Sequence, residues 1–342
     1  MVVPLSSTHD GDESVLVCRD LGVRFATPAG TMVAVEGASL ALRRGRVTGI
    51  VGESGSGKSQ LVMALTGLTV GEVTGSAELG GMRIAPVPER ALADVRGRRI
   101  AYVFQDPMTA LNPYLTVATQ LEEVATHHLN LDRAGARKKA LDLLNRVRIP
   151  DAESRIASFP HELSGGMRQR VMIAMALMAD PEVVIADEPT TALDATVQLR
   201  ILDLLRDLCR TDGLTLVLIS HDISVMALMA DDLIVMYAGR IVERGPAATL
   251  LTSPAHPYTR RLIDATPDLD SPVDAAPVGI PGQLPGPAGP RDRCLFADRC
   301  DRVGDVCRTA PPPLGSTAGT TAGHDVACHF PLPADAGSGG GA

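Results

Sequence analysis

The stretch GESGSGKS, residues 52–59, lies between two apolar runs, VTGIV (47–51) and LVMAL (61–65). It fits the pattern G-x-x-x-x-G-K-[ST], whose glycines let the backbone turn so tightly that successive N–H groups face phosphate oxygens. A preceding strand and a following helix are the expected context, because the N-terminus of the helix adds its positive dipole. We therefore predict a P-loop in which Lys58 reaches the β- and γ-phosphates and the Ser59 hydroxyl ligates magnesium. A glycine-rich turn that matches by chance is the alternative, and the strand–turn–helix context argues against it.

Two adjacent carboxylates end another apolar run, VVIADEP (183–189). Ligands of open α/β sheets bind at the carboxyl ends of the strands, so a strand that ends in Asp187 and Glu188 presents both side chains where a ligand lies. We predict that Asp187 holds the magnesium through water and that Glu188 polarises the attacking water as general base. Alone, such a run is often an ordinary strand end; together with GESGSGKS it indicates a P-loop nucleotide site.

The composition disfavours several classes of protein. The chain has 342 residues, which is room for about two domains. Its net charge of −8 gives no electrostatic reason to expect nucleic-acid binding. The longest purely apolar run, VMIAMALMA (171–179), has nine residues, whereas a membrane-spanning helix needs about 20. The N-terminal stretch MVVPLSSTHDGDES is acidic and lacks an apolar block, so we expect no secretory signal and a cytosolic chain whose thiols stay reduced.

The order of the apolar segments predicts an α/β core. Most of the strand-like runs are continuously apolar, as parallel strands covered on both faces are; the runs are 47–52, 99–105, 183–188, 214–221 and 232–239. Helices are predicted at 133–149 and 196–209. The second helix has one apolar stripe, formed by Val197, Ile201, Leu204, Leu205 and Leu208. Alternating strands and helices indicate a doubly wound sheet. Between Gln105 and Ser164 the strand pattern is absent, which predicts a helical insertion.

The composition changes after Gly245. Residues 265–290 contain seven prolines and four glycines, too many for a helix or a central strand, so we predict an irregular connection there. We accordingly predict four parts, a disordered leader, a core, an extension and a disordered tail, at 1–14, 15–245, 246–332 and 333–342.

The string LSGGMRQR (163–170) resembles the signature of ATP-binding-cassette (ABC) ATPases. Other motifs of that family are present in the usual order: Gln105 resembles the Q-loop, Ala192-Leu193-Asp194 the D-loop and His221 the switch histidine. The resemblance covers the predicted core. It implies the α/β fold of a P-loop NTPase ABC cassette, with a RecA-like core, an antiparallel β subdomain and a helical subdomain at about 106–163. A small irregular extension with cysteines follows the cassette.

The resemblance also implies roles for single residues. In the family, the signature starts a helix whose N-terminus meets the γ-phosphate of a nucleotide held by a second cassette, so that two cassettes close head to tail over two ATP molecules. Met167 stands where many cassettes carry Gln, as it commonly does in peptide-importer cassettes. Phe25 is our candidate for stacking on adenine, with a core phenylalanine as the alternative. The residues expected to bind ATP are Phe25, Gly52, Ser54, Gly55, Ser56, Gly57, Lys58, Ser59, Gln60, Ser164, Gly165, Gly166 and Asp194. Those expected to hold magnesium are Ser59, Gln105 and Asp187, and those expected to act in catalysis are Glu188, His221 and Gln105.

Four longer strings narrow the resemblance to the dipeptide/oligopeptide importer ATPases: FQDPMTALNP (104–113), SFPHELSGGMRQRVMIAMAL (158–177), DEPTTALDATVQ (187–198) and HPYTRRLIDATP (256–267). The resemblance implies an energy-coupling ATPase subunit, peripheral on the cytoplasmic face of a bacterial membrane. The implied partners are two transmembrane permease subunits that dock on residues 106–161, a second and related ATPase subunit that completes a heterodimer, and an extracytoplasmic binding protein that chooses the substrate.

Two alternative functions stay open. One is import of nickel or another small solute by the same subfamily, because the ATPase does not itself select the substrate. The remote alternative is a non-transport cassette protein acting on DNA or ribosomes. Only 105 residues separate Lys58 from Ser164, without the long coiled coil of DNA-maintenance cassettes, and the chain holds a single cassette. Its acidic balance also disfavours nucleic acid as a partner.

Four of the six cysteines lie in the extension, with five, six and twenty residues between them: Cys294, Cys300, Cys307 and Cys328. Disulfides are disfavoured in the cytosol, and zinc usually takes cysteines about two to four residues apart. The extension has few large apolar residues and would gain from a staple. From the residues alone, unliganded thiols, zinc and a Cys₄-bound cluster stay open. Some peptide-importer ATPases hold a 4Fe–4S cluster at such cysteines, and the resemblance therefore implies a structural cluster here, with His329 as a neighbour. Cys18 and Cys209 are expected to be ordinary buried thiols.

Overall fold

The computed structural model describes residues 14–28, 30–191, 193–265, 279–286, 288–316, 320 and 322–333. The predicted leader up to residue 13, the tail from residue 334 and Ala192 of the predicted D-loop lie outside the described residues. The described residues fall into two compact units. We call residues 14–16, 41–46 and 79–219 the signature unit, and residues 17–40, 47–78 and those from 220 onward the P-loop unit.

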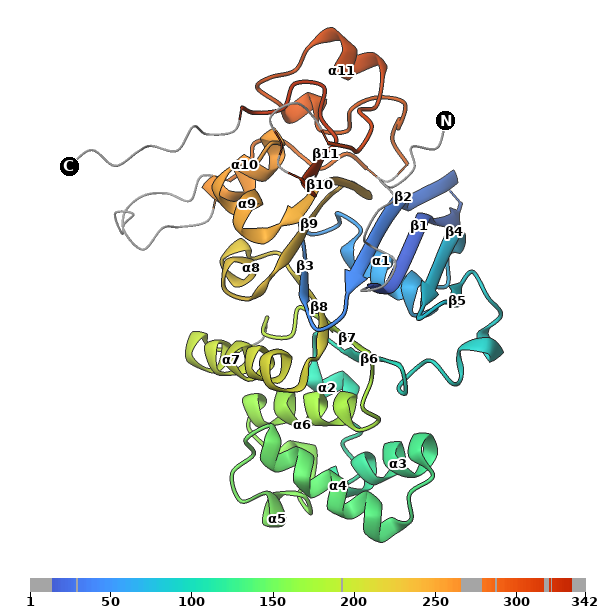
Figure 1. The fold of residues 1–342 in the computed structure, drawn as a ribbon, viewed down its shortest axis with the longest axis vertical. Coiled ribbons are helices and arrows are strands. Elements are labelled where there is room, and N and C mark those ends of the chain that lie inside the picture. Colours follow the sequence, from blue (N-terminus) through green and yellow to red (C-terminus); the bar gives the residue numbers. More distant parts are fainter. Residues whose placement is uncertain are drawn as a thin grey trace, which may run out of the picture. The chain divides into compact units, whose positions relative to one another are not determined.

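Two sets of strands belong to the P-loop unit (Figure 1). In the first set, which has most of its residues in this unit, the order is β2-β1-β4, with β1 at Ser14–Thr27, β2 at Gly30–Arg43 and β4 at Glu72–Leu79. In the second set the order is β11-β10-β9-β3, with β3 at Val47–Val51, β9 at Asp232–Tyr237, β10 at Arg240–Pro246 and β11 at Asp325–Val326. β3 and β9 are parallel, whereas β10 is antiparallel to both β9 and β11.

Short helices accompany these strands. They are α1 (Lys58–Leu65), α8 (Ile223–Met229), α9 (Ala247–Thr252), α10 (Pro257–Asp264), the 3₁₀ turn η3 (Ala297–Arg299) and α11 (Asp305–Thr309). Strand β11 joins the extension to the sheet, and next to it the Ala327 N–H donates to the Val242 carbonyl at 2.8 Å. The extension therefore shares one compact unit with the P-loop.

The signature unit contains three parallel strands in the order β8-β7-β6. They are β6 (Ile100–Val103), β7 (Val183–Asp187) and β8 (Thr215–Ser220). Every residue of β7 is buried, as its continuously apolar sequence predicts. Strand β5 (Met82–Ala85) and the 3₁₀ turn η1 (Glu89–Leu92) precede them. The helical elements are α2 (Pro107–Ala110), α3 (Val117–Leu129), α4 (Arg133–Arg146), α5 (Ala152–Arg155), the 3₁₀ turn η2 (Pro160–Glu162), α6 (Gly165–Leu177) and α7 (Ala195–Asp212).

The elements predicted from the sequence are confirmed, with small shifts of their ends. All five predicted strands and both predicted helices are present. All residues from 106 to 163 are described and none of them is in a strand, so the helical insertion is confirmed too. In the predicted irregular connection, the described residues 279–286 and 288–290 form neither helix nor strand. The predicted boundaries between leader, core, extension and tail stay predictions.

In helix α7, the apolar stripe predicted from the sequence periodicity is the buried face of the helix. Ile201, Leu204, Leu205 and Leu208 of the predicted stripe are buried, whereas Leu199 on another face is 58% exposed. The helix begins after Asp194, whose Oδ1 accepts from the Val197 N–H at 3.0 Å and so satisfies a donor of the first turn. Among the helices that the structure describes, none combines the length and the apolar character needed to cross a membrane.

Within the P-loop unit, Phe296 of the cysteine-containing segment packs against aromatic side chains of β9 and α10. Phe296 is 2% exposed and its ring lies 5.2 Å from that of Tyr237 and 5.5 Å from that of Tyr258, measured between centroids. His256 is also in this aromatic group, at 5.8 Å from Phe296. The segment that carries the four cysteines, in which few large apolar residues were noted, thus shares a core with β9 and α10.

Candidate nucleotide-binding site

The P-loop connects β3 to α1 in the P-loop unit. Gly57 has φ of +101°, and a β-carbon at that position would lie 2.5 Å from the Ala34 carbonyl oxygen, so only glycine fits. Lys58 is 5% exposed, and its Nζ donates to the carbonyls of Gly52 at 2.7 Å and Glu53 at 3.0 Å. The ammonium is therefore held at the loop itself, which is where the motif needs a positive charge for phosphates.

Other predicted ATP contacts lie on or beside this loop. The Ser56 side chain is completely buried, and its Oγ has no hydrogen-bond partner among the described residues. Ser54 and Gly55 are exposed, whereas Ser59 and Gln60 are half-buried in the first turn of α1. A loop in which Gly52 and Gly57 have no room for a β-carbon, with a buried lysine and a buried hydroxyl, fits a phosphate group well.

Phe25 and His221 belong to the P-loop unit as well. Phe25 lies in β1 and is half-buried, so it is not a fully buried core residue. His221 is exposed and follows β8 directly, next to Asp222, which caps α8. Their roles in stacking on adenine and in catalysis stay predictions.

Asp187 ends β7 in the signature unit and is 8% exposed. The Tyr102 hydroxyl of β6 donates to its Oδ2 at 2.7 Å. Burial and the charge of Asp187 raise the pKa of Tyr102 well above its ordinary value, so this hydroxyl keeps its proton and remains a donor. The bond holds the carboxylate in one orientation at the strand end. No pattern in the sequence pointed to Tyr102, because its contact with Asp187 depends on how β6 pairs with β7.

Glu188 follows Asp187 with a strained backbone. Its φ is +47°, unusual for a residue with a side chain, and its N–H donates to the Ile219 carbonyl at 3.0 Å. Glu188 Oε2 accepts from the Gln105 side-chain amide at 3.2 Å and from the Thr191 hydroxyl at 2.9 Å. The structure thus brings the predicted Q-loop glutamine to the predicted general base. Thr191 was not predicted, although its place three residues after Glu188 could have suggested it.

The signature residues form the N-terminus of α6. Ser164 caps this helix by accepting from the Met167 N–H at 3.3 Å, and Ser164 and Gly165 are exposed. A β-carbon on Gly166 would lie 2.6 Å from Val197 of α7, so glycine permits the close packing of α6 on the start of α7. Ser164 thus satisfies the Met167 N–H, and the exposed start of α6 carries the N–H groups of Gly165 and Gly166; their role in binding a phosphate stays a prediction.

The four cysteines of the extension lie near one another in the P-loop unit. The Cys294 N–H donates to the Cys307 carbonyl at 2.9 Å. Burial raises the pKa of Cys328 to about 11, and the charges of the other three thiols add to that effect. None of the four is in a disulfide. Within the described residues, however, no group of three or more His, Cys, Asp or Glu side chains has the geometry to hold a metal ion. The predicted cluster therefore has no support from a formed metal site.

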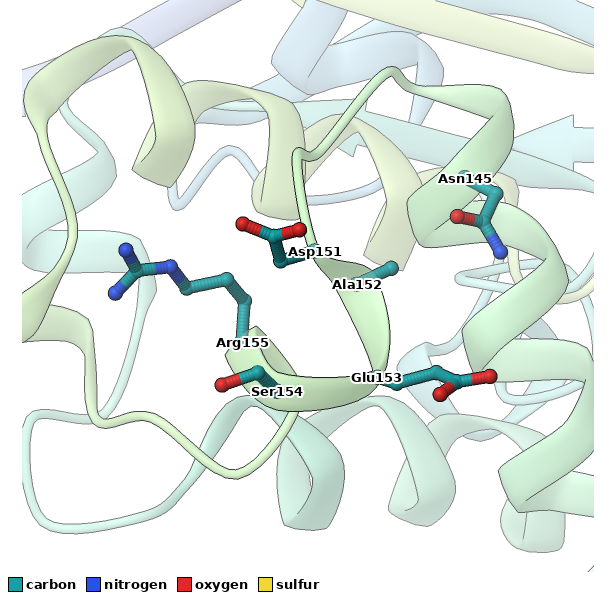
Figure 2. Close-up of a pocket in the computed structure, with 6 residues that line it drawn as sticks. All are labelled: Asn145, Asp151, Ala152, Glu153, Ser154 and Arg155. Carbon is teal, nitrogen blue, oxygen red and sulfur yellow. The ribbon is translucent and has the colours of Figure 1, made fainter.

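A hollow of about 600 Å³ lies elsewhere in the signature unit, where α4 turns into α5 (Figure 2). Asn145 of α4 lines one side and Arg155 of α5 lies opposite, with Asp151, Ala152, Glu153 and Ser154 between them. The hollow is open and polar and contains none of the residues predicted to bind nucleotide. It lies within residues 106–161, the segment predicted to meet the permease.

Comparison with known proteins identifies the family. Residues 35–191 match the ABC transporter family, and residues 242–307 match the family described as oligopeptide/dipeptide transporter, C-terminal region. The chain is 47% identical to the oligopeptide transport ATP-binding protein OppD of Salmonella typhimurium, over 87% of this chain and 89% of that protein. It is 42% identical to the dipeptide transport ATP-binding protein DppD of Escherichia coli K12, over 91% of this chain and 95% of that protein.

A solved structure agrees on the fold. The dimeric ATP-binding cassette MJ0796, in a post-hydrolysis state with ADP and Pi, matches with a TM-score of 0.61 at 27% identity, over 68% of this chain and 98% of that one. The chain belongs to the ABC transporter family and is an ABC-type ATPase. It also carries the C-terminal region that the oligopeptide/dipeptide transporter family defines. The family and fold class predicted from the sequence are confirmed.

Proposed function

We propose that this chain is the energy-coupling ATPase of a bacterial importer for dipeptides or oligopeptides. The observation that carries the proposal is that similarity to peptide-transport ATP-binding proteins extends over about nine-tenths of the chain, including its C-terminal region. The ATPase engine alone would not define the substrate, because many transporters share it. The C-terminal region is the part that distinguishes this chain from other cassettes.

The proposed chemistry is hydrolysis of the γ-phosphoryl bond of ATP. Lys58 and the P-loop N–H groups bind the phosphates, and Ser59, Gln105 and Asp187 are the side chains that would hold Mg²⁺, which supplies charge neutralisation when bound. Glu188 takes a proton from the attacking water as the oxygen bonds to phosphorus and the bond to ADP breaks. Support comes from the orientation of Glu188 by Gln105 and Thr191 and of Asp187 by Tyr102. His221 is the second candidate for the general base that accepts this proton.

The partners follow from the proposed function. Ser164, Gly165, Gly166 and Asp194 would complete the ATP site of a second, related ATPase subunit, which supplies the same groups in return. The surface of residues 106–161, which includes the polar hollow at α5, would receive two transmembrane permease subunits on the cytoplasmic face of the membrane. An extracytoplasmic binding protein would select the peptide.

We also propose a 4Fe–4S cluster on Cys294, Cys300, Cys307 and Cys328, with a structural role. Its support is that the four thiols influence one another and share one small region. Thiolates on four different irons lie farther apart than thiolates on one ion, so the absence of a single-ion geometry does not decide the matter. Protein purified without oxygen should be brown, with iron and sulfide at about four per chain. Cys300→Ser should bleach it, and a colourless preparation with zinc or no metal would refute the cluster.

The nucleotide chemistry is tested by two substitutions. Glu188→Gln should keep ATP binding but reduce turnover by about 10²–10⁴, the usual loss for a positioned base. Lys58→Ala should instead weaken ATP binding by roughly tenfold to a hundredfold, because it removes a charged donor from the phosphates. Glu89→Gln is the matched control, since the Glu89 side chain is 87% exposed and forms an ion pair with the half-buried Arg96. Near-normal turnover of Glu188→Gln would move the base role to His221.

The substrate class is tested in cells. A strain that lacks this gene should lose uptake of labelled dipeptides or oligopeptides and regain it with the wild-type chain but not with Lys58→Ala. Normal peptide uptake, together with poor growth at limiting nickel, would favour the nickel alternative.

A further inference from the structure

Arg299 of the extension forms hydrogen bonds with the P-loop residue Glu53. Arg299 lies at the end of η3, one residue before Cys300, and its side chain is only 4% exposed. Its Nη1 donates to Glu53 Oε1 at 2.9 Å and its Nη2 to Glu53 Oε2 at 3.1 Å. Glu53 is the second residue of GESGSGKS. A bidentate pair of this kind, with a nearly buried arginine and a glutamate that is 29% exposed, fixes both position and orientation of the carboxylate.

The rest of the guanidinium is equally well held. Nε donates to the Pro281 carbonyl at 2.8 Å and Nη2 to the Ile280 carbonyl at 3.0 Å, so Arg299 also binds the segment that precedes the cysteines. The cation lies 5.8 Å from the ring centroid of Tyr237, whose hydroxyl accepts from Nη1 at 3.3 Å. Arg299 therefore has little freedom to move away from Glu53.

The backbone of Glu53 is bound by another residue of the C-terminal region. Its N–H donates to the hydroxyl oxygen of Tyr258 at 2.9 Å, and Tyr258 is completely buried in α10. Further along the loop, a β-carbon on Gly55 would be in van der Waals contact with Leu284 at 3.7 Å. Two parts of the C-terminal region, η3 through Arg299 and α10 through Tyr258, thus contact the loop between β3 and α1.

Glu53, which these contacts hold, is itself hydrogen-bonded to Lys58, the lysine proposed to bind phosphate. Lys58 Nζ donates to the carbonyl of Glu53 as well as to that of Gly52. A shift of Glu53 therefore shifts an acceptor of the ammonium. Through this path, Arg299 and Tyr258 can set the position of Lys58 without touching the nucleotide.

We infer that Arg299 and Tyr258 are positioning residues for the P-loop, by which the C-terminal extension holds the phosphate-binding loop in its binding conformation. The inference rests on the proposed role of this loop in binding ATP. Its physical basis is preorganisation: a loop already held in its binding conformation loses less freedom when ATP binds. The extension is then part of the ATP-binding apparatus, and its effect is on ATP affinity rather than on the hydrolytic step.

The experiment measures ATP affinity of the full chain with a fluorescent ATP analogue, and KM and kcat for ATP in the assembled transporter. Arg299→Gln and Glu53→Gln should each weaken analogue binding by about tenfold and raise KM similarly, with kcat changed less than about twofold. The double variant should be no weaker than either single variant, because both remove the same pair. Arg299→Lys keeps the charge but not the geometry of two parallel hydrogen bonds, so its affinity for the analogue should lie between those of the wild type and Arg299→Gln.

Arg293→Gln is the matched control. Arg293 precedes Cys294 as Arg299 precedes Cys300, and it also forms a bidentate pair, but with Asp298 of its own segment, at 3.2 and 2.6 Å. It should bind the analogue as the wild type does. Tyr258→Phe, which removes only the hydroxyl, keeps the test valid if Arg299→Gln does not fold; it should weaken binding by about threefold.

The outcomes separate the inference from the proposed function. If the wild type binds the analogue no better than Lys58→Ala, the proposed role of the loop is wrong. If wild-type binding is normal and folded Arg299→Gln and Tyr258→Phe bind equally well, only the inference is overturned. Additive losses in the Arg299→Gln, Glu53→Gln double variant would also overturn it, since Arg299 would then not act through Glu53.

Discussion

At the residue scale, the most buried charge in the P-loop unit is the carboxylate of Glu243. It is 0% exposed and accepts from the Ala255 N–H at 2.6 Å and the His256 N–H at 3.0 Å. Its Oε1 also lies 2.7 Å from His324 Nε2. A buried carboxylate is costly unless its oxygens are hydrogen-bonded, and these partners meet that need. Glu243 thereby joins β10 to α10 and to the segment that leads to Cys328.

A pH dependence follows from the neighbouring imidazole. Burial lowers the pKa of His256 to about 4, against a partial opposing effect of the Glu243 charge. In the unfolded chain the pKa is about 6.5. As pH falls below about 6.5, His256 becomes protonated in the unfolded chain but stays neutral in the folded protein. Protonation therefore favours the unfolded chain, and the stability that is present above pH about 6.5 is lost as pH falls toward 4. From pH 7 to pH 5 this group should cost roughly 2 kcal/mol of unfolding free energy.

The measurement compares the wild type with His256→Asn by urea unfolding at both pH values. Asparagine can still cap α10, as His256 does by accepting from the Tyr258 N–H at 3.0 Å, but it does not titrate. The loss on acidification should therefore be smaller in the variant by about the amount given above. Equal losses in both proteins would show that His256 is not the titrating group.

At the element scale, α7 was predicted from its periodicity and the structure shows the same apolar face. The P-loop and the N-terminus of α6 were also predictable, because a strand, a short turn and a helix follow one another within a few residues. Local spacing is enough there to define which atoms face a ligand. Contacts between residues far apart in the chain cannot be read from this local spacing and come from tertiary packing.

The packing of α7 gives a stability prediction. Leu205→Ala removes a completely buried side chain and should lower the unfolding free energy by about 2–5 kcal/mol. Leu199→Ala changes the same residue type in the same helix where it is 58% exposed, and should stay within about 0.5 kcal/mol of the wild type. Chemical denaturation followed by circular dichroism measures both. Similar effects of the two substitutions would contradict the packing of α7 described here.

At the scale of the whole molecule, the proposed ATP sites are shared between two cassettes. In the proposed arrangement, Ser164 and Gly166 serve a nucleotide bound by another subunit, so an isolated chain would lack half of each site. We expect the purified chain to be monomeric without ATP and a weak ATPase. Assembly with the permease subunits should raise turnover by roughly tenfold or more.

Light scattering and ATPase assays at low protein concentration test this expectation. The assembled complex with Lys58→Ala is the control and should remain inactive. Transport-level turnover by dilute, isolated wild-type chain would refute the need for a partner.

The sequence by itself determined the class of fold, the P-loop, the carboxylate pair and the signature helix, because each is a local pattern in which neighbouring residues share one element. Only the tertiary structure decided which side chains hold these groups in place. Tyr102 reaches Asp187 across 85 residues of chain, and Arg299 reaches Glu53 across 246. Such contacts depend on how strands pair and how the extension packs on its sheet. Because many separate packing interactions set that geometry, no short stretch of sequence encodes it.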